Sequence, residues 1–314
     1  MTIRQLQKEV LNLKKRNDVT ILAHYYQPIE IQEIADYLGD SLGLSRTAKE
    51  ETNTEYIIFA GVDFMAETAS ILNQDKKVLI PNPESCCPMA AFLNQEKVIQ
   101  YKKENPEVPM VTYINSTAAV KAESDICCTS SNAIKISQKI AKEFNTNSVL
   151  FGPDANLADY VEQKSEIKTI KAPSKGHCYV HSQLTISDII DSKQKFPDVR
   201  VLVHPECKRE VRDIADFVGS TGQMYNKVKE SSNDEKSFII GTEKGLVERM
   251  AKDFPEKKFH LASSKMICYN MKKNTIELMK YVLENLDDPA FLVEVPSHIA
   301  KRALQPINKM LSYS

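Results

Sequence analysis

Three cysteines recur at nearly equal intervals along this chain, and together they could hold a metal. Cys87 lies 91 residues before Cys178, and Cys268 lies 90 residues after it, which is the spacing that an internal triplication produces. Three thiolates brought to one point can ligate zinc or an iron–sulfur cluster. A [4Fe–4S] cluster with three protein ligands leaves one iron open, and an open metal can polarise a substrate hydroxyl or carboxylate. The alternative is that all three are buried small apolar residues, as free cysteines often are.

Polar residues recur at nearly the same spacing in sequence as the cysteines. In each third of the chain an apolar run ends in two polar residues at alternate positions, and the first members lie 89 and 91 residues apart: His24 and Tyr26, Tyr113 and Asn115, His204 and Glu206. Side chains at alternate positions of a strand point to the same side. Histidine exchanges protons near neutral pH, and tyrosine and glutamate can act as acid or base. We therefore expect a proton-transfer site that also includes His181, with Asn115 holding a carboxylate.

A hydroxyl side chain stands 17 residues after the first member of each polar pair. These hydroxyls are Ser41, Ser130 and Thr221, the last with Ser220 beside it, and each stands before an expected helix. Free backbone N–H groups and the helix dipole favour anions at such positions, although simple helix capping is the alternative role. Several helix ends around one cavity would suit a phosphorylated or dicarboxylate ligand.

Apolar strands alternate with helix-like segments throughout the chain. Each third carries three expected strands, and the second of them ends at a glycine followed by an acidic residue; the strands cover residues 19–23, 56–59, 77–80, 108–112, 149–152, 167–170, 199–203, 238–240 and 258–261. The expected helices include residues 2–16, 31–38, 211–217 and 271–286. This alternation predicts parallel sheets with right-handed crossovers and a ligand site beyond the carboxyl ends of the strands.

We therefore predict an α/β fold of three homologous three-layer αβα domains with parallel sheets around a pseudo-threefold axis, with the active site at the centre. The predicted domains cover residues 1–97, 98–187 and 188–286. The last segment, residues 287–314, has a helical pattern without a counterpart in the repeat, and we expect it to pack back on the first domain.

The composition is that of an ordinary soluble protein. The chain has 314 residues, 42% of them hydrophobic and 26% charged, with a formal net charge of −1, so electrostatics give no reason to expect binding to nucleic acid or to an anionic membrane. No run of eighteen apolar residues predicts a membrane span, and the first residues lack a signal-peptide core. Seven cysteines in such a chain favour reduced thiols in the cytoplasm. We interpret Cys86, Cys127 and Cys128 as packing residues and Cys207 as non-ligating.

Ten short segments, in order over nearly the whole chain, resemble the quinolinate synthase A family. They are AHYYQ (23–27), GDSLGLS (39–45), CPMA (87–90), TYINSTAAVKA (112–122), TSSNA (129–133), GPDANLA (152–158), GHCYVH (176–181), HPEC (204–207), GSTGQM (219–224) and CYNMK (268–272). The resemblance implies a transferase-type enzyme that condenses iminoaspartate (iminosuccinate) with dihydroxyacetone phosphate. The products would be quinolinate, phosphate and water, in de novo NAD biosynthesis. A functional link to L-aspartate oxidase is also implied.

The resemblance further implies which residues carry the reaction. An oxygen-sensitive [4Fe–4S] cluster, its open iron acting as a Lewis acid, would be held by Cys87, Cys178 and Cys268, since the CPMA context selects Cys87 over Cys86. The implied catalytic residues are His24, Tyr26, His181, His204 and Glu206. The implied substrate-binding residues are His24, Ser41, Tyr113, Asn115, Ser130, His204, Glu206, Ser220 and Thr221.

Three other functions use the same thiolates. An iron–sulfur hydro-lyase of another dicarboxylate would use the same open iron, and quinolinate formation against simple hydration of fumarate-like acids separates the two. A redox sensor with a cluster predicts a DNA-binding helix-turn-helix or basic face, and the sequence contains neither. A zinc protein is distinguished by metal and sulfide analysis.

Overall fold

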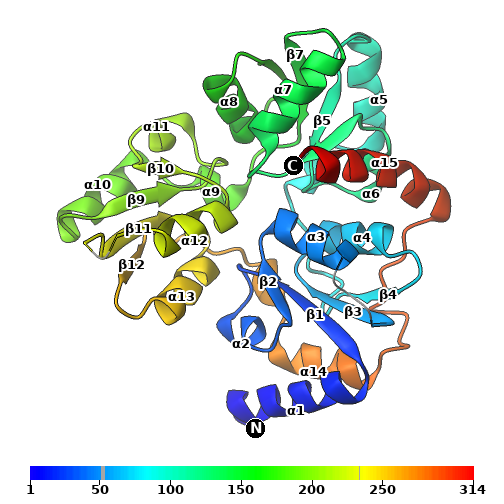
Figure 1. The fold of residues 1–314 in the computed structure, drawn as a ribbon, viewed down its shortest axis with the longest axis vertical. Helices are drawn as coiled ribbons and strands as arrows, with labels where there is room; N and C mark the ends of the chain where they lie inside the picture. Colours follow the sequence, from blue (N-terminus) through cyan, green and yellow to red (C-terminus); the bar gives the residue numbers. More distant parts are fainter. Residues whose placement is uncertain (51–53, 233) are drawn as a thin grey trace.

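The computed structural model describes residues 1–50, 54–232 and 234–314. Within them the chain forms three four-stranded parallel sheets, each flanked by helices. Figure 1 shows the three α/β units grouped around a common centre. The predicted α/β fold of three αβα domains with three layers each is confirmed. The threefold symmetry of their arrangement stays a prediction.

The three units have the same order of elements. The first has strands in the order β2-β1-β3-β4 and contains α1 (Ile3–Arg16), β1 (Val19–His24), α2 (Ile29–Gln32), β2 (Tyr37–Gly39), α3 (Ser41–Glu50), β3 (Tyr56–Ala60), α4 (Asp63–Leu72), β4 (Lys77–Leu79) and the 3-10 turn η1 (Ala90–Phe92). The second has the order β6-β5-β7-β8 and contains α5 (Gln95–Glu104), β5 (Met110–Tyr113), α6 (Ala118–Ala122), β6 (Ile126–Cys128), α7 (Ala133–Glu143), β7 (Ser148–Gly152), α8 (Ala155–Lys164), β8 (Lys168–Lys171) and α9 (Tyr179–Ser182).

The third unit has strands in the order β10-β9-β11-β12. It contains α10 (Ile186–Lys195), β9 (Arg200–Val203), α11 (Arg209–Arg212), β10 (Phe217–Val218), α12 (Thr221–Lys229), β11 (Ser237–Gly241), α13 (Lys244–Asp253), β12 (Lys258–Leu261) and the 3-10 turn η2 (Met271–Lys273). Two further helices follow, α14 (Ile276–Glu284) and α15 (Ser297–Tyr313).

A hydrogen bond to an aspartate at the edge of each sheet is repeated three times. Asp36, Asp125 and Asp216 each accept a hydrogen bond from a backbone N–H fifteen residues earlier, at 2.8, 2.7 and 2.8 Å, from Ile21, Met110 and Val201. These acidic residues keep the period that the sequence showed. Their role is to satisfy a strand N–H that the neighbouring strand leaves unpaired, because a buried donor without a partner is costly.

The sequence reasoning missed one strand in each unit. Residues 37–38 and residue 217 were assigned to helices, but Tyr37–Gly39, Ile126–Cys128 and Phe217–Val218 form the outer strands β2, β6 and β10. These strands have two or three residues each, which is too short to show an alternating pattern. Their pairing with the neighbouring strand, rather than their own composition, determines their conformation.

The two C-terminal helices connect units that are distant in sequence. Helix α14 packs beside α1 on the first unit and buries Met279 and Val282 in the same core as Leu6 and Val10. Before α15, the chain runs along β4, where the Val293 N–H donates to Val78 O. Helix α15 then lies mainly against α6 and β6 of the second unit and also contacts α4, as Figure 1 shows. The last segment therefore joins the first and second units, whereas we expected it on the first alone.

No helix in the described part of the chain is long and apolar enough to cross a membrane. The cytoplasmic location stays a prediction.

Candidate active site and metal centre

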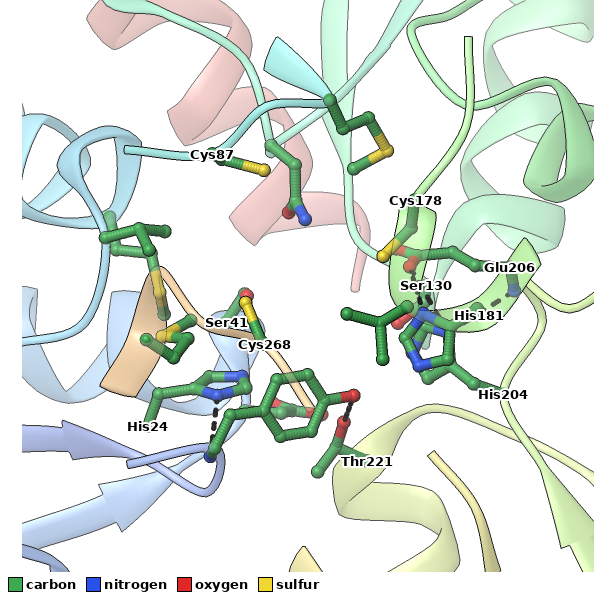
Figure 2. A pocket seen from close by; sticks show the side chains of 18 of the residues that line it. His24, Ser41, Cys87, Ser130, Cys178, His181, His204, Glu206, Thr221 and Cys268 are labelled. Atoms are coloured by element: carbon green, nitrogen blue, oxygen red, sulfur yellow. Dashed lines mark hydrogen bonds and ion pairs between the residues drawn. The ribbon is translucent and has the colours of Figure 1, made fainter. Parts of the chain in front are cut away.

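One cavity collects side chains from all three units at the carboxyl ends of their strands (Figure 2). Thirteen of the fourteen residues that the sequence singled out line it: His24, Tyr26, Ser41, Cys87, Tyr113, Asn115, Ser130, Cys178, His181, His204, Glu206, Thr221 and Cys268. The other, Ser220, lies just behind the wall as the N-cap of α12, and its Oγ contacts Asp40 Oδ2 at 3.1 Å. The parallel topology therefore brings together residues up to 244 positions apart, from His24 to Cys268.

The three cysteines occupy matching places in the three units. Each lies in the loop after the last strand of its sheet, directly or closely followed by a short helical turn: η1, α9 and η2. Figure 2 shows the side chains of Cys87, Cys178 and Cys268 pointing into the same space. The arrangement on which the metal hypothesis depends, one sulfur from each unit at a shared cavity, is present in the structure.

The surroundings of the thiols fit a metal-binding role. Burial raises the pKa of all three, and for Cys87 the nearby Cys268 raises the pKa further. Backbone hydrogen bonds act in the opposite direction, from Ala90 to Cys87, from His181 to Cys178 and from Met271 to Cys268, always three residues further along the chain. A bound cation makes a coordinating thiol lose its proton outright. Three half-buried thiols that already receive backbone N–H groups are therefore suited to an iron–sulfur cluster or to zinc.

A second group of possible ligand atoms lies next to Cys178. The ligand atoms of Cys178, His181 and Glu206 lie within 4.8 Å of one another. Both ring nitrogens of His181 are already engaged, Nδ1 with Glu206 Oε2 at 2.6 Å and Nε2 with Thr242 Oγ1 at 2.9 Å. Hydrogen bonding explains this grouping without a metal.

A continuous chain of hydrogen bonds crosses the cavity wall from the second unit to the first. The Tyr113 hydroxyl donates to Glu206 Oε1 at 2.5 Å, and Glu206 Oε2 bonds His181. From His181 the chain continues through the Thr242 hydroxyl to the Tyr26 hydroxyl at 2.6 Å, and from there to the Thr221 hydroxyl at 3.0 Å. Five of the six residues were expected from the sequence, and Thr242 is the one that was not.

The hydrogen bonds of this series can point in either of two directions. With a proton on Nδ1 of His181 and none on Nε2, the Thr221, Tyr26 and Thr242 hydroxyls all donate toward the histidine. If Nε2 also carries a proton, Thr242 Oγ1 accepts from it, and the three hydroxyls can turn and donate away from the histidine. In that orientation a proton held at His181 can be passed on at the Tyr26 and Thr221 end.

Two of the histidines are held neutral. Burial and, to a smaller extent, the charge of Lys272 together lower the pKa of His24 to about 3. Burial lowers the pKa of His204 to about 3 as well, with the stacked ring of His181, 4.4 Å away, contributing. Glu206 stays ionised: burial acts to raise its pKa, but the two histidines and the hydrogen bonds from His181 and Tyr113 outweigh burial and lower it. The site thus combines one buried carboxylate with neutral imidazoles.

Two further features suit a polar ligand, the first for its anionic groups and the second for a hydrogen-bond donor. The first residues of α3 and α12 line the cavity, with Ser41 and Thr221, and Ser130 does so just before α7, so free N–H groups of three helices lie near it. The Asn115 Oδ1 atom is buried and has no hydrogen-bond partner among the described residues. A buried polar atom of this kind is normally paired, and here it lines a cavity that can hold the partner.

The remaining cysteines lie outside the cavity. Cys127 and Cys128 are fully buried packing residues, as expected. Cys207 is buried with its Sγ 3.6 Å from the Gly241 carbonyl oxygen. Cys86 is exposed, so its interpretation as a packing residue was wrong; it and Cys87 have different surroundings although they are neighbours in sequence.

Comparison with known proteins agrees with the geometry. The family model described as quinolinate synthetase A protein matches residues 8–312. The chain belongs to the quinolinate synthase A family. It is 45% identical to a quinolinate synthase of Methanothermobacter thermautotrophicus over 312 residues, covering 99% of each chain. It is 45% identical to that of Clostridium kluyveri over 307 residues, 98% of each, and 44% identical to that of Thermotoga maritima over 302 residues, 96% of this chain and 97% of the other.

Among solved structures, an E-1-hydroxy-2-methyl-but-2-enyl-4-diphosphate reductase from Plasmodium falciparum aligns over 91% of this chain and 84% of its own, with 12% identity and a TM-score of 0.29. A similarity this low says nothing about function. Membership of the quinolinate synthase A family therefore rests on the sequence matches, which the ten short segments had indicated.

Proposed function

We propose that this chain condenses iminoaspartate with dihydroxyacetone phosphate to form quinolinate, phosphate and water, as a step of NAD biosynthesis. The observation that carries the proposal is the cavity to which each of three units contributes one cysteine, beside a buried network of acid, base and hydroxyl groups. Membership of the quinolinate synthase A family supports the same reaction.

Cys87, Cys178 and Cys268 would hold a [4Fe–4S] cluster. When bound, such a cluster supplies an open iron, which is a Lewis acid toward a hydroxyl or carboxylate of the substrate. The three thiols account for three of the four cluster irons, and no fourth cysteine lines the cavity among the described residues. Zinc on the same thiols is the competing occupant.

The polar groups of the cavity divide into binding and proton-transfer groups. The helix ends at Ser41, Ser130 and Thr221 bind and orient the carboxylates and phosphate of the substrates. Asn115 offers its Nδ2 to a carboxylate and its unpartnered Oδ1 to a hydroxyl or amine of the substrate. Tyr26 and His181 exchange a proton through Thr242, and Glu206 stabilises the charge on His181 when Nε2 takes up that proton.

His24 and His204 are neutral near pH 7 because burial holds their pKa to about 3. Each has its Nδ1 next to a backbone N–H, from Tyr26 at 3.1 Å for His24 and from Glu206 at 3.3 Å for His204. An accepting Nδ1 places the proton of the neutral ring on Nε2. Both rings therefore offer an N–H donor that can stabilise a developing oxyanion.

The test is an anaerobic assay of the whole chain. Protein reconstituted with iron and sulfide is mixed with dihydroxyacetone phosphate and iminoaspartate generated by an L-aspartate oxidase, and quinolinate and phosphate are measured. Equal amounts of both products, only with the reconstituted protein, are expected. Hydration of fumarate-like acids without quinolinate would favour the hydro-lyase, and activity with zinc and no sulfide would overturn the cluster.

A further inference from the structure

Each cysteine of the cavity has its backbone N–H bonded by a carboxylate from a neighbouring loop. The carboxylates come from the residues at or next to the start of α4, α8 and α13, directly after the second strand of each unit. The bonds are Asp63 Oδ1 to Cys87 N at 3.1 Å, Asp154 Oδ2 to Cys178 N at 2.9 Å and Glu243 Oε1 to Cys268 N at 3.2 Å. The sequence showed an acidic residue at these places but gave it no role.

A second contact ties the same loops. The carbonyl oxygen two residues before each cysteine accepts from a backbone N–H at the start of the same helix, at 2.8, 2.8 and 3.0 Å: Asp63 to Ser85, Ala155 to Gly176 and Lys244 to Met266. In the second unit the approach leaves no room for a side chain, since a Cβ on Gly176 would lie 1.8 Å from the Pro153 carbonyl oxygen. Every cysteine loop is therefore bonded to the start of the neighbouring helix at two points, the cysteine N–H and the carbonyl oxygen two residues before it.

The same three carboxylates also bond the first turn of their helices. Asp63 Oδ1 accepts from Phe64 N at 2.8 Å, Asp154 Oδ1 from Leu157 N at 2.7 Å, and Glu243 Oε2 from Gly245 N at 2.6 Å. Asp63 stands one position later than the other two, as the first helical residue rather than the N-cap. Each carboxylate thus joins a helix end to a cysteine.

Helix capping alone does not explain the carboxylates of Asp154 and Glu243. One acceptor is enough for a cap, and serine, threonine and asparagine supply it as well as aspartate does. Asp154 and Glu243 are fully buried and each uses both oxygens as acceptors, one for the helix and one for the cysteine. Only a carboxylate offers two equivalent acceptor oxygens, so the contact to the cysteine accounts for the residue type at Asp154. At Glu243 an ion pair with Lys272 at 3.1 Å contributes as well.

We propose that Asp63, Asp154 and Glu243 are positioning residues that hold the three cysteine loops in the geometry needed by the metal centre before it is bound. The inference rests on the proposed iron–sulfur cluster. Groups that orient metal ligands typically change metal affinity by about 10- to 100-fold when they are removed. A preformed loop also avoids the entropy cost of ordering the ligand residues at the moment of binding.

The decisive variant is Asp154→Ser, because serine keeps the helix cap and is too short to reach Cys178 as well. Asn94→Ala is the matched control, since Asn94 caps α5 by accepting from Lys97 N and contacts no cysteine. After anaerobic reconstitution, iron and sulfide per chain and the rate of cluster loss to a chelator are measured. We expect Asp154→Ser to lose the cluster about 10- to 100-fold faster than the wild type, and Asn94→Ala to lose it at the wild-type rate.

A second measurement does not need the cluster. Amide hydrogen exchange of peptides covering residues 174–180 is followed in the cluster-free proteins, and we expect faster exchange in Asp154→Ser than in the wild type or in Asn94→Ala. Cluster loss and exchange both within twofold of the wild type would overturn the proposal. If the wild type itself binds no iron and sulfide, the proposed cofactor fails, and the exchange result still decides whether Asp154 fixes the loop.

If Asp154→Ser does not fold, Asp63→Ser is used in its place. Its side chain is only half-buried, and the same two measurements then report on Cys87 and on residues 83–89. The same acceleration of cluster loss and exchange is expected, and its absence would overturn the proposal.

Discussion

Replacing Thr242 with valine removes one hydroxyl from the centre of the site and keeps the shape of the side chain. Thr242 is fully buried, and its Oγ1 joins His181 Nε2 at 2.9 Å to the Tyr26 hydroxyl at 2.6 Å. In Thr242→Val, Tyr26 keeps its bond to Thr221, whereas His181 Nε2 loses the only partner that the structure gives it. A buried polar group left without a partner costs about 1–3 kcal/mol, so the free energy of unfolding should fall by about 2 kcal/mol.

The effect on turnover should be larger than the effect on stability suggests. If Tyr26 and His181 exchange a proton through Thr242, the valine variant breaks the route while both end groups remain. Proton transfer by a positioned side chain contributes about 100- to 10,000-fold to rate, so kcat should fall at least about tenfold with KM little changed. Quinolinate formation under saturating substrates measures kcat, and urea unfolding of the cluster-free protein measures stability.

A control and a double-mutant cycle separate the two effects. Thr20→Val removes a buried hydroxyl that bonds Thr54 at 2.8 Å, far from the cavity, and should lower stability with unchanged kcat. Tyr26→Phe combined with Thr242→Val should show a coupling energy of about 0.5–3 kcal/mol, since both substitutions remove the same bond. An unchanged kcat in Thr242→Val, or strictly additive losses in the cycle, would refute the relay.

Three other predictions address the metal, the buried histidine and the repeated hydrogen bond from a strand N–H to an aspartate. Cys178→Ala should abolish the brown absorbance of the reconstituted protein and its turnover, whereas Cys207→Ala, a buried cysteine outside the cavity, should keep both; full activity without iron would contradict the role. Burial lowers the pKa of His24 to about 3, so below its ordinary pKa of 6.5 the unfolded chain binds a proton that the folded chain does not. The stability of the cluster-free wild type relative to His24→Gln should therefore fall by up to about 1.4 kcal/mol per pH unit as the pH drops below 6.5, and equal differences at pH 7 and pH 5.5 in urea would argue against it. Asp125→Ala leaves the buried Met110 N–H unpaired and should cost about 1–3 kcal/mol in unfolding with kcat unchanged; a stability equal to the wild type would show that the edge contact is not needed.

The sequence predicted the site better than it predicted the sheet edges. The polar pairs follow fully buried, mainly apolar runs, such as residues 19–23 of β1, and the end of a buried strand is recognisable from sequence alone. The outer strands β2, β6 and β10 have two or three residues and take their conformation from the neighbouring strand, so no local pattern indicates them. The position of α15 likewise depends on which apolar face α6 leaves uncovered, and that face is defined only after the second sheet has formed.

Thr242 was missed because it has no equivalent in the other two units of the repeat. The matching positions of the other units hold Val62 and Pro153, neither of which has a side-chain donor, so the comparison of units points to no function there. The useful signal would have been a hydroxyl directly after a buried strand at the sheet end where the other site residues gather. Comparing the units identifies the residues that they share, but it does not detect a role that only one unit has.

This difference between shared and individual residues follows from the chemistry of the site. The cysteines and the carboxylates behind them recur in all three units, as the equivalent sulfur ligands of the proposed cluster would require. The strand-end pairs differ in every unit, as His24 with Tyr26, Tyr113 with Asn115 and His204 with Glu206, because a substrate without threefold symmetry can be oriented only by unlike groups. Substitutions in the first set should therefore change cluster retention, and substitutions in the second should change turnover on a cluster that is retained. A strand-end variant that loses its cluster as fast as Cys178→Ala would show that the two tasks are not divided in this way.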